Sequence, residues 1–276
     1  NATLYEFDLG NGIFQNSTSG SLTYRYPVSG NYTVNVVAKG STGLTTSKSI
    51  NVSVTVVQSM VWSDEFDQPG APNPQKWIYD IGAGGWGNHE SQYYTNRLDN
   101  AIVSNGTLKI IAKAETYSGS SYTSARLLSR TKFTFKYGKI EVSAKVPVGA
   151  GTWPAIWMLG DNFPTVGWPA CGEIDIMEHK GSDPNRIHGS VHYPGFSGGN
   201  AVTATTLIQG AATSFHLYAC EWSPQSIKFF VDGNLFQTVA NTSSLPFNQS
   251  FFVLLNQAMG GTFGGAIDPA FSNATF

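Results

Sequence analysis

Apolar and polar side chains alternate along most of this chain, and a period of two is typical of strands with one buried face. The alternation occurs in five stretches of the sequence: 32–36, 50–56, 133–137, 140–146 and 227–231. Gly, Asn, Asp and Pro separate these stretches, and Asp232-Gly233-Asn234 predicts a hairpin turn. Since we find no amphipathic helix longer than two turns, the sequence predicts an all-β antiparallel sandwich or barrel.

The composition excludes several classes of protein. The 276 residues are 41% hydrophobic and 12% charged, which excludes a disordered chain. The formal net charge of −2 gives no basic excess, so no nucleic-acid partner is expected. No run approaches the roughly 18 apolar residues of a membrane helix, so no membrane partner is expected. Cys171 and Cys220 are too few for a disulfide-built fold, and the sequence leaves open whether they are bonded.

The composition also changes near residue 58. Residues 1–57 contain no Trp and are rich in Thr, Ser, Asn and Val, whereas all seven Trp lie from Trp62 onward. We therefore expect a small β-sandwich module in 1–57 and a larger domain in 59–276, joined by a short linker.

Three motif matches lack the context that their chemistry needs. Residues 82–87 fit the dinucleotide fingerprint G-x-G-x-x-G, but no helical pattern follows them. Residues 195–199 fit G-x-S-x-G, but a nucleophile elbow joins a buried strand to a helix. His188 and His192 are four residues apart without the helix of a zinc protease. We therefore expect none of these functions.

Three carboxylates fall within six positions of a chain that has few charges: Glu173, Asp175 and Glu178. On a regular strand Glu173 and Asp175 share a face, whereas Glu178 would point into the core at a cost of several kcal/mol. A β-bulge at Ile176-Met177 removes this conflict and brings all three to one face. Bulges are frequent beside active sites, so the spacing predicts one here.

Clustered acids repel one another, so at least one pKa should rise. Glycoside hydrolysis requires such an acid next to an ionised carboxylate, and retention places the two carboxyl groups about 5–5.5 Å apart. The first and last acids would be roughly 13 Å apart at Cα, at about 3.3 Å per residue, so their side chains must lean together. A calcium site and a solvated acidic face are the alternatives.

Tryptophans near the acids suit a sugar ligand, because sugar rings stack their C–H faces on aromatic rings. Trp153, Trp157 and Trp168 lie within about twenty residues of the acids, and Trp86 lies in a polar loop. Trp157, between two apolar neighbours, is expected in the core, and Trp168 is expected to be exposed.

The acidic segment closely resembles the E-x-D-x-x-E signature of glycoside hydrolase family sixteen, in its laminarinase-type (endo-β-1,3-glucanase) branch. The resemblance extends over most of 59–276 through an ordered set of motifs. These are Trp62-Ser-Asp64-Glu65-Phe66, Gly85-Trp86-Gly87-Asn88, Tyr137-Gly138-Lys-Ile-Glu141, Gly151-Thr-Trp153-Pro-Ala-Ile-Trp157, His188-Gly-Ser-Val-His192-Tyr, Glu221-Trp222 and Leu255-Asn256-Gln-Ala-Met-Gly-Gly261. It implies a curved, concanavalin-like β-jelly-roll sandwich with sugar on its concave face and hydrolysis with retention.

Residue roles follow from the resemblance by motif position. Glu173 would be the nucleophile, Glu178 the general acid/base, and Asp175 would tune the nucleophile. Substrate contacts are implied for seven further residues: Trp86, Asn88, Arg126, Trp153, Trp168, His192 and Asn256. Agarases and carrageenases of the family can share the longer signature, so mixed-linkage glucan, agar and carrageenan remain alternative substrates. The Gly-Trp-Gly-Asn loop and Trp168-Pro-Ala-Cys-Gly favour a β-1,3-glucan.

The resemblance has further implications for the ends of the chain. Residues 1–57 resemble the later part of a PKD-type immunoglobulin-like module, through Tyr5-Glu-Phe7-Asp-Leu-Gly-Asn-Gly12 and Tyr26-Pro-Val-Ser-Gly30-Asn-Tyr32-Thr-Val34. The family pattern implies a closing strand after Phe276. It also implies a structural calcium ion on the convex face, held by Glu65 and the Gly106 carbonyl, with an aspartate from that closing strand.

We therefore expect a secreted or cell-surface, monomeric endo-hydrolase whose partner is a polysaccharide and whose catalysis needs no cofactor. The alternative from another class is a non-catalytic glucan-binding protein on the same fold. Such binders usually lose a catalytic carboxylate, whereas this chain keeps all three.

Overall fold

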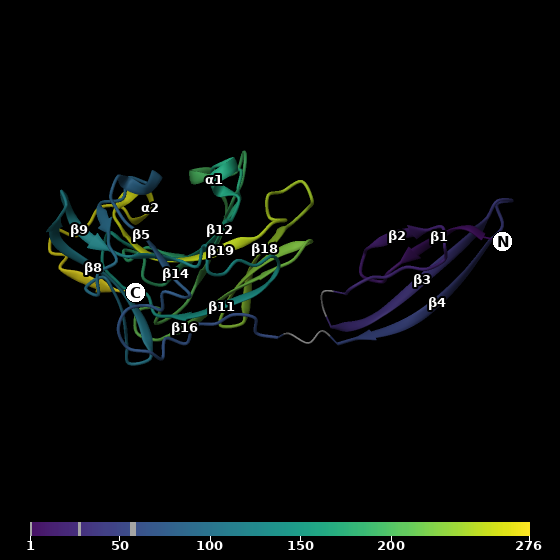
Figure 1. Ribbon diagram of the computed structural model, residues 1–276, viewed down its shortest axis with the longest axis horizontal. Coiled ribbons are helices and arrows are strands. Elements are labelled where there is room, and N and C mark those ends of the chain that lie inside the picture. The colour runs from purple at the N-terminus through teal and green to yellow at the C-terminus, as the bar shows by residue number, and fades with distance from the viewer. Residues whose placement is uncertain (1, 27–28, 56–58) are drawn as a thin grey trace. The chain divides into compact units, whose positions relative to one another are not determined.

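Figure 1 shows the computed structural model, which describes residues 2–26, 29–55 and 59–276. The chain divides into two compact units, Asn1–Val61 and Trp62–Phe276. The predicted boundary near residue 58 and the last residue of the predicted strand 50–56 lie outside the described residues. In the described residues no helix is long and apolar enough to cross a membrane.

The N-terminal unit contains one antiparallel sheet in the order β2-β1-β3-β4. Its strands are β1 (Ala2–Asp8), β2 (Phe14–Ser17), β3 (Gly30–Gly40) and β4 (Thr45–Val54). Polar side chains pair across one face, where Thr33 donates to Asn51 at 2.9 Å and Ser53 donates to Asn31 at 2.6 Å. The described residues form a single sheet, so the second sheet of the expected sandwich stays a prediction.

The larger unit is an all-β sandwich, as the alternation predicts. One sheet has the order β15-β14-β13-β12-β19-β10-β5, and a second has the order β11-β16-β17-β18. The strands of the first are β5 (Ile78–Asp80), β10 (Arg126–Leu128), β12 (Thr152–Gly160), β13 (Glu173–His179), β14 (Arg186–His192), β15 (Val202–Leu207) and β19 (Phe251–Met259). Those of the second are β11 (Gly138–Ala144), β16 (His216–Trp222), β17 (Ser226–Val231) and β18 (Asn234–Ala240).

A third group of strands, in the order β20-β8-β9-β6, completes this unit. It comprises β6 (Gln92–Tyr94), β8 (Thr107–Tyr117), β9 (Ser120–Ser124) and β20 (Asn273–Thr275), and β7 (Ala101–Ser104) also pairs with β8. Helical segments are limited to η1 (Gly85–Gly87), α1 (Phe163–Val166), η2 (Gly198–Asn200) and α2 (Gly261–Gly264) among the described residues. The closing strand expected after Phe276 stays a prediction.

The main core lies between the seven-stranded sheet and the sheet β11-β16-β17-β18. Ile174 and Ile176 of β13 are fully buried in one hydrophobic cluster with Cys220 of β16 and Phe229 of β17. Neighbouring strand residues point to opposite faces, so the other face of the seven-stranded sheet lies outside this core and carries a smaller hydrophobic cluster around Leu159 and Leu254 beside polar side chains. That second face carries the predicted carboxylates.

The hairpin predicted at residues 232–234 is confirmed. Asp232 and Gly233 both have positive φ, 49° and 77°, between β17 and β18. Positive φ at both central positions is what a two-residue type I′ turn requires.

Residues 133–137 do not form the predicted strand. Their only pairing is an isolated bridge between Phe135 and Phe251, and Tyr137 has a φ of 61°. The alternation arises from ring packing instead, since Phe133 stacks on Trp62 at 5.0 Å and Phe135 meets Trp222 at 5.8 Å. Aromatic side chains in an irregular segment thus produced the pattern of a strand.

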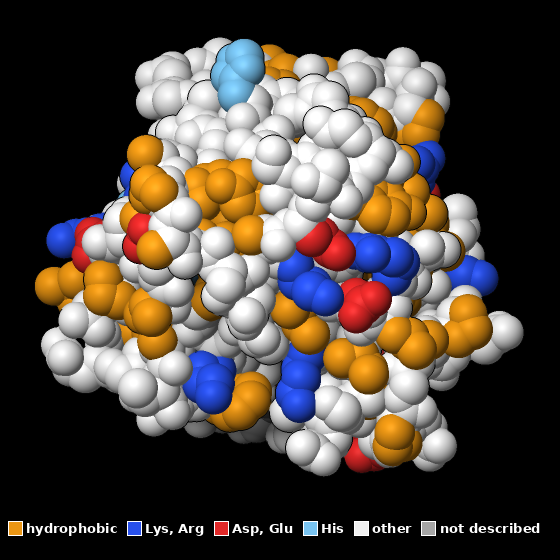
Figure 2. Space-filling view, turned by 90° about the vertical axis from the view of Figure 1, so that its left-hand side faces the viewer, with side chains coloured by type: hydrophobic (Ala, Val, Ile, Leu, Met, Phe, Trp, Pro, Cys, Tyr) orange, Lys and Arg blue, Asp and Glu red, His pale blue; other side chains and the backbone are white. Residues whose placement is uncertain are grey.

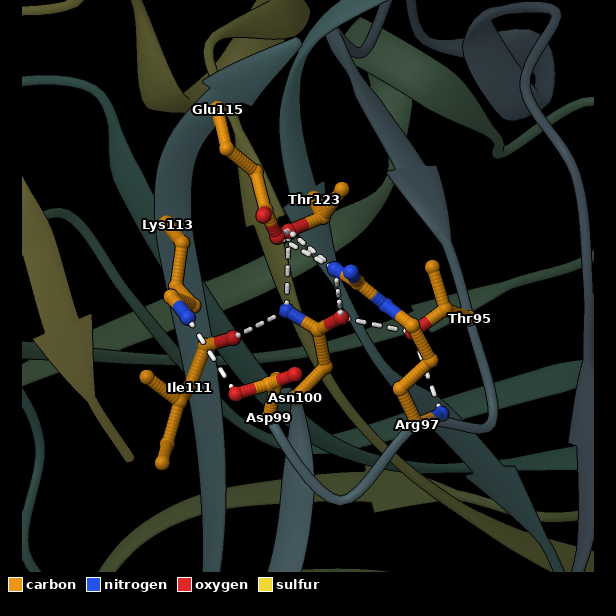
Figure 3. Close-up of polar contacts among 8 residues, drawn as sticks. All are labelled: Thr95, Arg97, Asp99, Asn100, Ile111, Lys113, Glu115 and Thr123. Atoms are coloured by element: carbon orange, nitrogen blue, oxygen red, sulfur yellow. Dashed lines mark hydrogen bonds and ion pairs between the residues drawn. The ribbon is translucent and has the colours of Figure 1, made fainter. Parts of the chain in front are cut away.

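A polar network joins the loop that follows β6 to β8 and β9 (Figure 3). Strands β6 and β9 themselves form a parallel pair. Arg97 contacts Glu115 and donates to Asn100 at 2.9 Å, while Asn100 donates to Thr123 at 2.9 Å. On the face that carries β8 and β9, basic and acidic side chains lie beside one another (Figure 2). Each charge in this network is therefore offset locally, and we assign the network a structural role.

Candidate active site

The β-bulge predicted at Ile176-Met177 is present in β13. On one side Trp157 pairs with Asp175 and Ile156 with Met177, so β13 carries one residue more than β12 there. On the other side the register with β14 shifts between Asp175 and Glu178. Ile174, Ile176 and Met177 are all fully buried, whereas Glu178 leaves the core. The bulge thus brings Glu178 back to the face that carries the other two acids.

A histidine from the neighbouring strand lies among these acids. His192 Nε2 is 2.9 Å from Asp175 Oδ2 and 3.7 Å from Glu173 Oε1. The backbone N–H of Gly198 donates to His192 Nδ1 at 3.1 Å. Because Nδ1 accepts this hydrogen bond, the neutral ring carries its proton on Nε2, where it faces the two carboxylates.

Burial shifts the pKa of every acid in the cluster upward. It raises the pKa of Asp175 to about 8 and, with added repulsion from Asp175, raises that of Glu178 to about 8. Burial and the charge of Asp175 also raise the pKa of Glu173 well above its usual value. One carboxyl oxygen of Glu173 lies within 4.8 Å of one of Asp175, so the two groups repel each other when both are ionised. At neutral pH the cluster therefore holds protonated carboxyl groups.

Two tryptophans flank the acids in different ways. The indole Nε1 of Trp153 donates to Glu178 Oε1 at 3.0 Å, and this ring is only 8% exposed. Trp168 is 45% exposed, and its ring centroid lies 5.9 Å from that of His192. The expected exposure of Trp168 is confirmed, and it offers a free ring face beside the acids.

The remaining predicted substrate contacts form a second group. Arg126 lies 2.9 Å from Asp80, with its guanidinium group 5.2 Å from the ring centroid of Trp86. Asn88 donates to Glu90 at 3.3 Å. Asn256 is only 5% exposed, and its side-chain amide donates to the Tyr94 hydroxyl at 3.0 Å. Asn256 therefore supports the wall of the site rather than presenting a free amide.

Trp157 is not in the main core that its neighbours predicted, but packs half-buried against a second, smaller hydrophobic cluster. Ile156 and Met158 are fully buried, but Trp157 lies on the opposite face, directly across from Asp175. Its Nε1 donates to Asn256 Oδ1 at 2.7 Å, and the Arg126 guanidinium group lies 4.7 Å from its ring centroid. Strand alternation alone, with its apolar neighbours in the core, could have placed Trp157 in the site.

Sequence reasoning also missed Glu90. Its carboxylate accepts from Gln92 at 2.6 Å, from the Tyr94 hydroxyl at 3.0 Å and from Asn88. Burial raises the pKa of Glu90, while these hydrogen bonds and the positive charge of Arg126 lower it by a smaller amount. The hydrogen bonds that run from Glu90 through Tyr94 to Asn256 could not be read from the sequence.

The predicted calcium ligands, Glu65 and Gly106, are both exposed and lie far from the three acids along the chain. Among the described residues, only Glu173, Asp175 and His192 bring three potential ligand atoms within 4.8 Å of one another. His192 faces both of these carboxyl groups through one ring nitrogen, and we assign no metal there. Cys171 and Cys220 are both buried free thiols, and burial raises the pKa of Cys171 to about 11.

The sequence and the fold both match known proteins. The family model for glycosyl hydrolases family 16 matches residues 88–265. A β-glucanase from Rhodothermus marinus is 46% identical over 226 residues, which cover 76% of this chain and 79% of the relative. The crystal structure of the laminarinase from Rhodothermus marinus, at 45% identity, superposes with a TM-score of 0.74 over 78% of this chain and 92% of that one.

A further solved structure agrees with these. The laminarinase catalytic domain from Thermotoga maritima is 40% identical, with a TM-score of 0.74 over 79% of this chain and 94% of that one. The jelly-roll fold, the bulged carboxylate strand and these matches lead to one conclusion. The chain belongs to glycosyl hydrolases family 16 and is a glycoside hydrolase.

Proposed function

We propose that this protein is an endo-acting, retaining hydrolase of β-1,3-glucan, with Glu173 as nucleophile and Glu178 as general acid/base. The observation that carries this proposal is the bulge in β13, which places three acids on one face, with Asp175 buried and the other two half-buried. The similarity to laminarinases supports β-1,3-glucan over the other polysaccharides that the family's signature allows.

The reaction proceeds in two displacements. In the first, the Glu173 carboxylate attacks the anomeric carbon, the bond to the glycosidic oxygen breaks, and Glu178 gives its proton to that oxygen. In the second, Glu178 takes a proton from water while the water oxygen displaces Glu173 from the anomeric carbon. The raised pKa of Glu178, about 8, keeps its proton available for the first step at neutral pH.

Asp175 and His192 position the nucleophile. In the reactive state Asp175 carries a proton and Glu173 is ionised. His192 stabilises this arrangement because its Nε2 faces both carboxyl groups at 2.9 and 3.7 Å. The hydrogen bond from Gly198 to Nδ1 fixes the orientation of the ring.

Aromatic and polar residues on both sides of the acids bind the glucan. Trp168 offers an exposed ring face for stacking on one side. Trp86, Asn88 and Arg126 bind the glycone side, where Arg126 lies between the rings of Trp86 and Trp157.

The rest of the proposal concerns the whole protein. We propose that it acts as a secreted or cell-surface monomer and that residues 1–57 are a PKD-type accessory module. Catalysis uses no cofactor, and the proposed calcium ion at Glu65 and the Gly106 carbonyl would serve stability with hard oxygen ligands.

Hydrolysis of laminarin by the wild type and by Glu173→Ser, followed through reducing ends, tests the function. The wild type should release short oligosaccharides, and Glu173→Ser should release none while remaining folded. Parallel assays on mixed-linkage glucan, agar and carrageenan define the substrate. If one of these polysaccharides is cleaved and laminarin is not, the substrate assignment is overturned. If laminarin is bound but not cleaved, the assignment as an enzyme is overturned.

A further inference from the structure

The ring of Phe263 in α2 lies at the centre of three contacts beside Glu178. Its centroid is 5.1 Å from the ring of Trp153 and 5.0 Å from that of His188, which it meets edge-on. Trp153 donates to Glu178, and His188 pairs with Glu178 across β13 and β14. Phe263 therefore packs against two of the residues that surround the proposed acid/base.

The third contact is with a cation. The ammonium nitrogen of Lys180 lies 4.4 Å from the Phe263 ring centroid, within the roughly 6 Å of a cation–π contact. Lys180 follows Glu178 by two residues, and its positive charge lowers the pKa of Glu178. No salt bridge of Lys180 is found in the part of the chain that the structure describes. The ring face of Phe263 is thus its electrostatic partner.

The backbone around Phe263 fixes the ring in this place. Thr262 N–H donates to the Asn88 carbonyl at 2.8 Å, and Gly260 N–H donates to the Gly151 carbonyl at 2.7 Å. A Cβ atom at Gly264 would lie 3.3 Å from Trp153 Cβ, so the segment packs closely on that tryptophan. The short helix is therefore held by the backbone at Asn88 and Gly151, which fixes the position of its one aromatic side chain.

We propose that Phe263 is a positioning residue that holds the Lys180 ammonium group on its ring face and away from the Glu178 carboxyl group. The proposal rests on the role of Glu178 as acid/base. An ammonium group that paired with Glu178 would stabilise its ionised form and remove the proton that the first displacement needs.

Other groups act on Glu178 from the elements around it. Asp175 raises its pKa from within β13, while His192 of β14 and the Trp153 hydrogen bond from β12 lower it. His188, also of β14, is held neutral near pH 7, because burial and the nearby positive charge of Lys180 lower its pKa to about 4. Lys180 has a long, flexible side chain, so a change at residue 263 can free its ammonium group to move from the ring toward Glu178.

The test is the pKa of Glu178 in the full chain, measured by NMR titration of ¹³C-labelled glutamate carboxyl groups. The resonance is assigned by its absence in Glu178→Gln. Phe263→Leu keeps an apolar side chain of similar volume but removes the ring face. We expect this variant to lower the pKa of Glu178 by about 1–3 units, as a newly paired cation does. Phe263→Tyr keeps a ring and should leave the pKa unchanged.

The double variant Phe263→Leu/Lys180→Met separates the cation from any change in hydration. It should restore the pKa of Glu178 to the wild-type value or above it. An unchanged pKa in Phe263→Leu would overturn the proposal, as would an equal drop in the double variant. The titration does not depend on turnover, so it stands apart from the laminarin assay that decides the proposed function.

Discussion

The Trp153 indole acts on Glu178 against the effect of burial. Its N–H donates to the carboxylate and lowers the pKa of Glu178, which burial raises to about 8. Trp153→Phe removes this donor but keeps an aromatic ring. We predict that the alkaline limb of the kcat/KM profile moves to higher pH and that kcat falls, because Glu178 is less firmly oriented. A pH profile on laminarin measures both effects. An alkaline limb that stays in place or moves to lower pH would contradict this account.

The same carboxyl group links stability to pH. Its pKa is about 8 in the folded protein and near 4.5 when unfolded, so the folded state binds more protons between these values. Its contribution to stability is fully present below pH 4.5 and is lost as the pH rises through 8. We therefore predict that the free energy of unfolding of the wild type falls relative to that of Glu178→Gln between pH 5 and 8. The fall is at most about 1.4 kcal/mol per pH unit.

Urea unfolding of both proteins at several pH values checks this prediction. If the free energies of unfolding of the two proteins change in parallel from pH 5 to 8, the pKa of Glu178 is not raised in the folded state and the prediction is wrong.

At this scale the sequence predicted the acids but not their surroundings. The spacing of Glu173, Asp175 and Glu178 conflicts with strand alternation, and only a bulge resolves it, so local chemistry was sufficient. Trp157 was missed although its alternation with Ile156 and Met158 already indicates the face of the acids. Glu90 was missed because its contacts depend on how the surrounding loop folds, and the hydrogen bond from Asn256 to its partner Tyr94 joins distant parts of the chain. Long-range hydrogen bonds of this kind leave no local pattern.

At the scale of the element, the bulge in β13 decides which face Glu178 occupies. Deletion of Ile176 leaves Glu173, Asp175 and Glu178 at alternate positions of an unbulged strand, so plain alternation keeps all three acids on the same face. We predict a folded variant that still hydrolyses laminarin, at a lower rate because the acids are one residue closer together along β13.

Ile176→Val is the matched control, because it keeps the bulge and costs only about 0.5–1.5 kcal/mol. Activity and urea unfolding of the two variants are compared with those of the wild type. Loss of all hydrolysis in a folded deletion variant would show that the bulge does more than decide which face Glu178 occupies.

Element prediction from alternation worked where strands pair and failed where aromatic rings pack on one another. The stretches 140–144 and 227–231 lie in β11 and β17, whereas Phe133 and Phe135 belong to an irregular segment. Periodicity records which side chains are buried, but backbone pairing depends on a partner strand that the local sequence does not reveal.

At the scale of the whole molecule, all residues of the proposed catalytic machinery lie in the unit Trp62–Phe276. We predict that this unit alone, expressed from residue 62, keeps the wild-type kcat and KM on short laminari-oligosaccharides. Steady-state kinetics of the truncated and the full chain make the comparison. A large drop in kcat for the folded truncated protein would assign part of the active site to the N-terminal unit.

The central claim is a double displacement in which Glu173 attacks the anomeric carbon and Glu178 first gives and then takes a proton. The most direct test follows laminarin hydrolysis by the wild type with time-resolved proton NMR of the new anomeric centres. Our account predicts that β anomers form first and that α anomers appear later by mutarotation. Initial α anomers would contradict it, because a single displacement by water inverts the configuration.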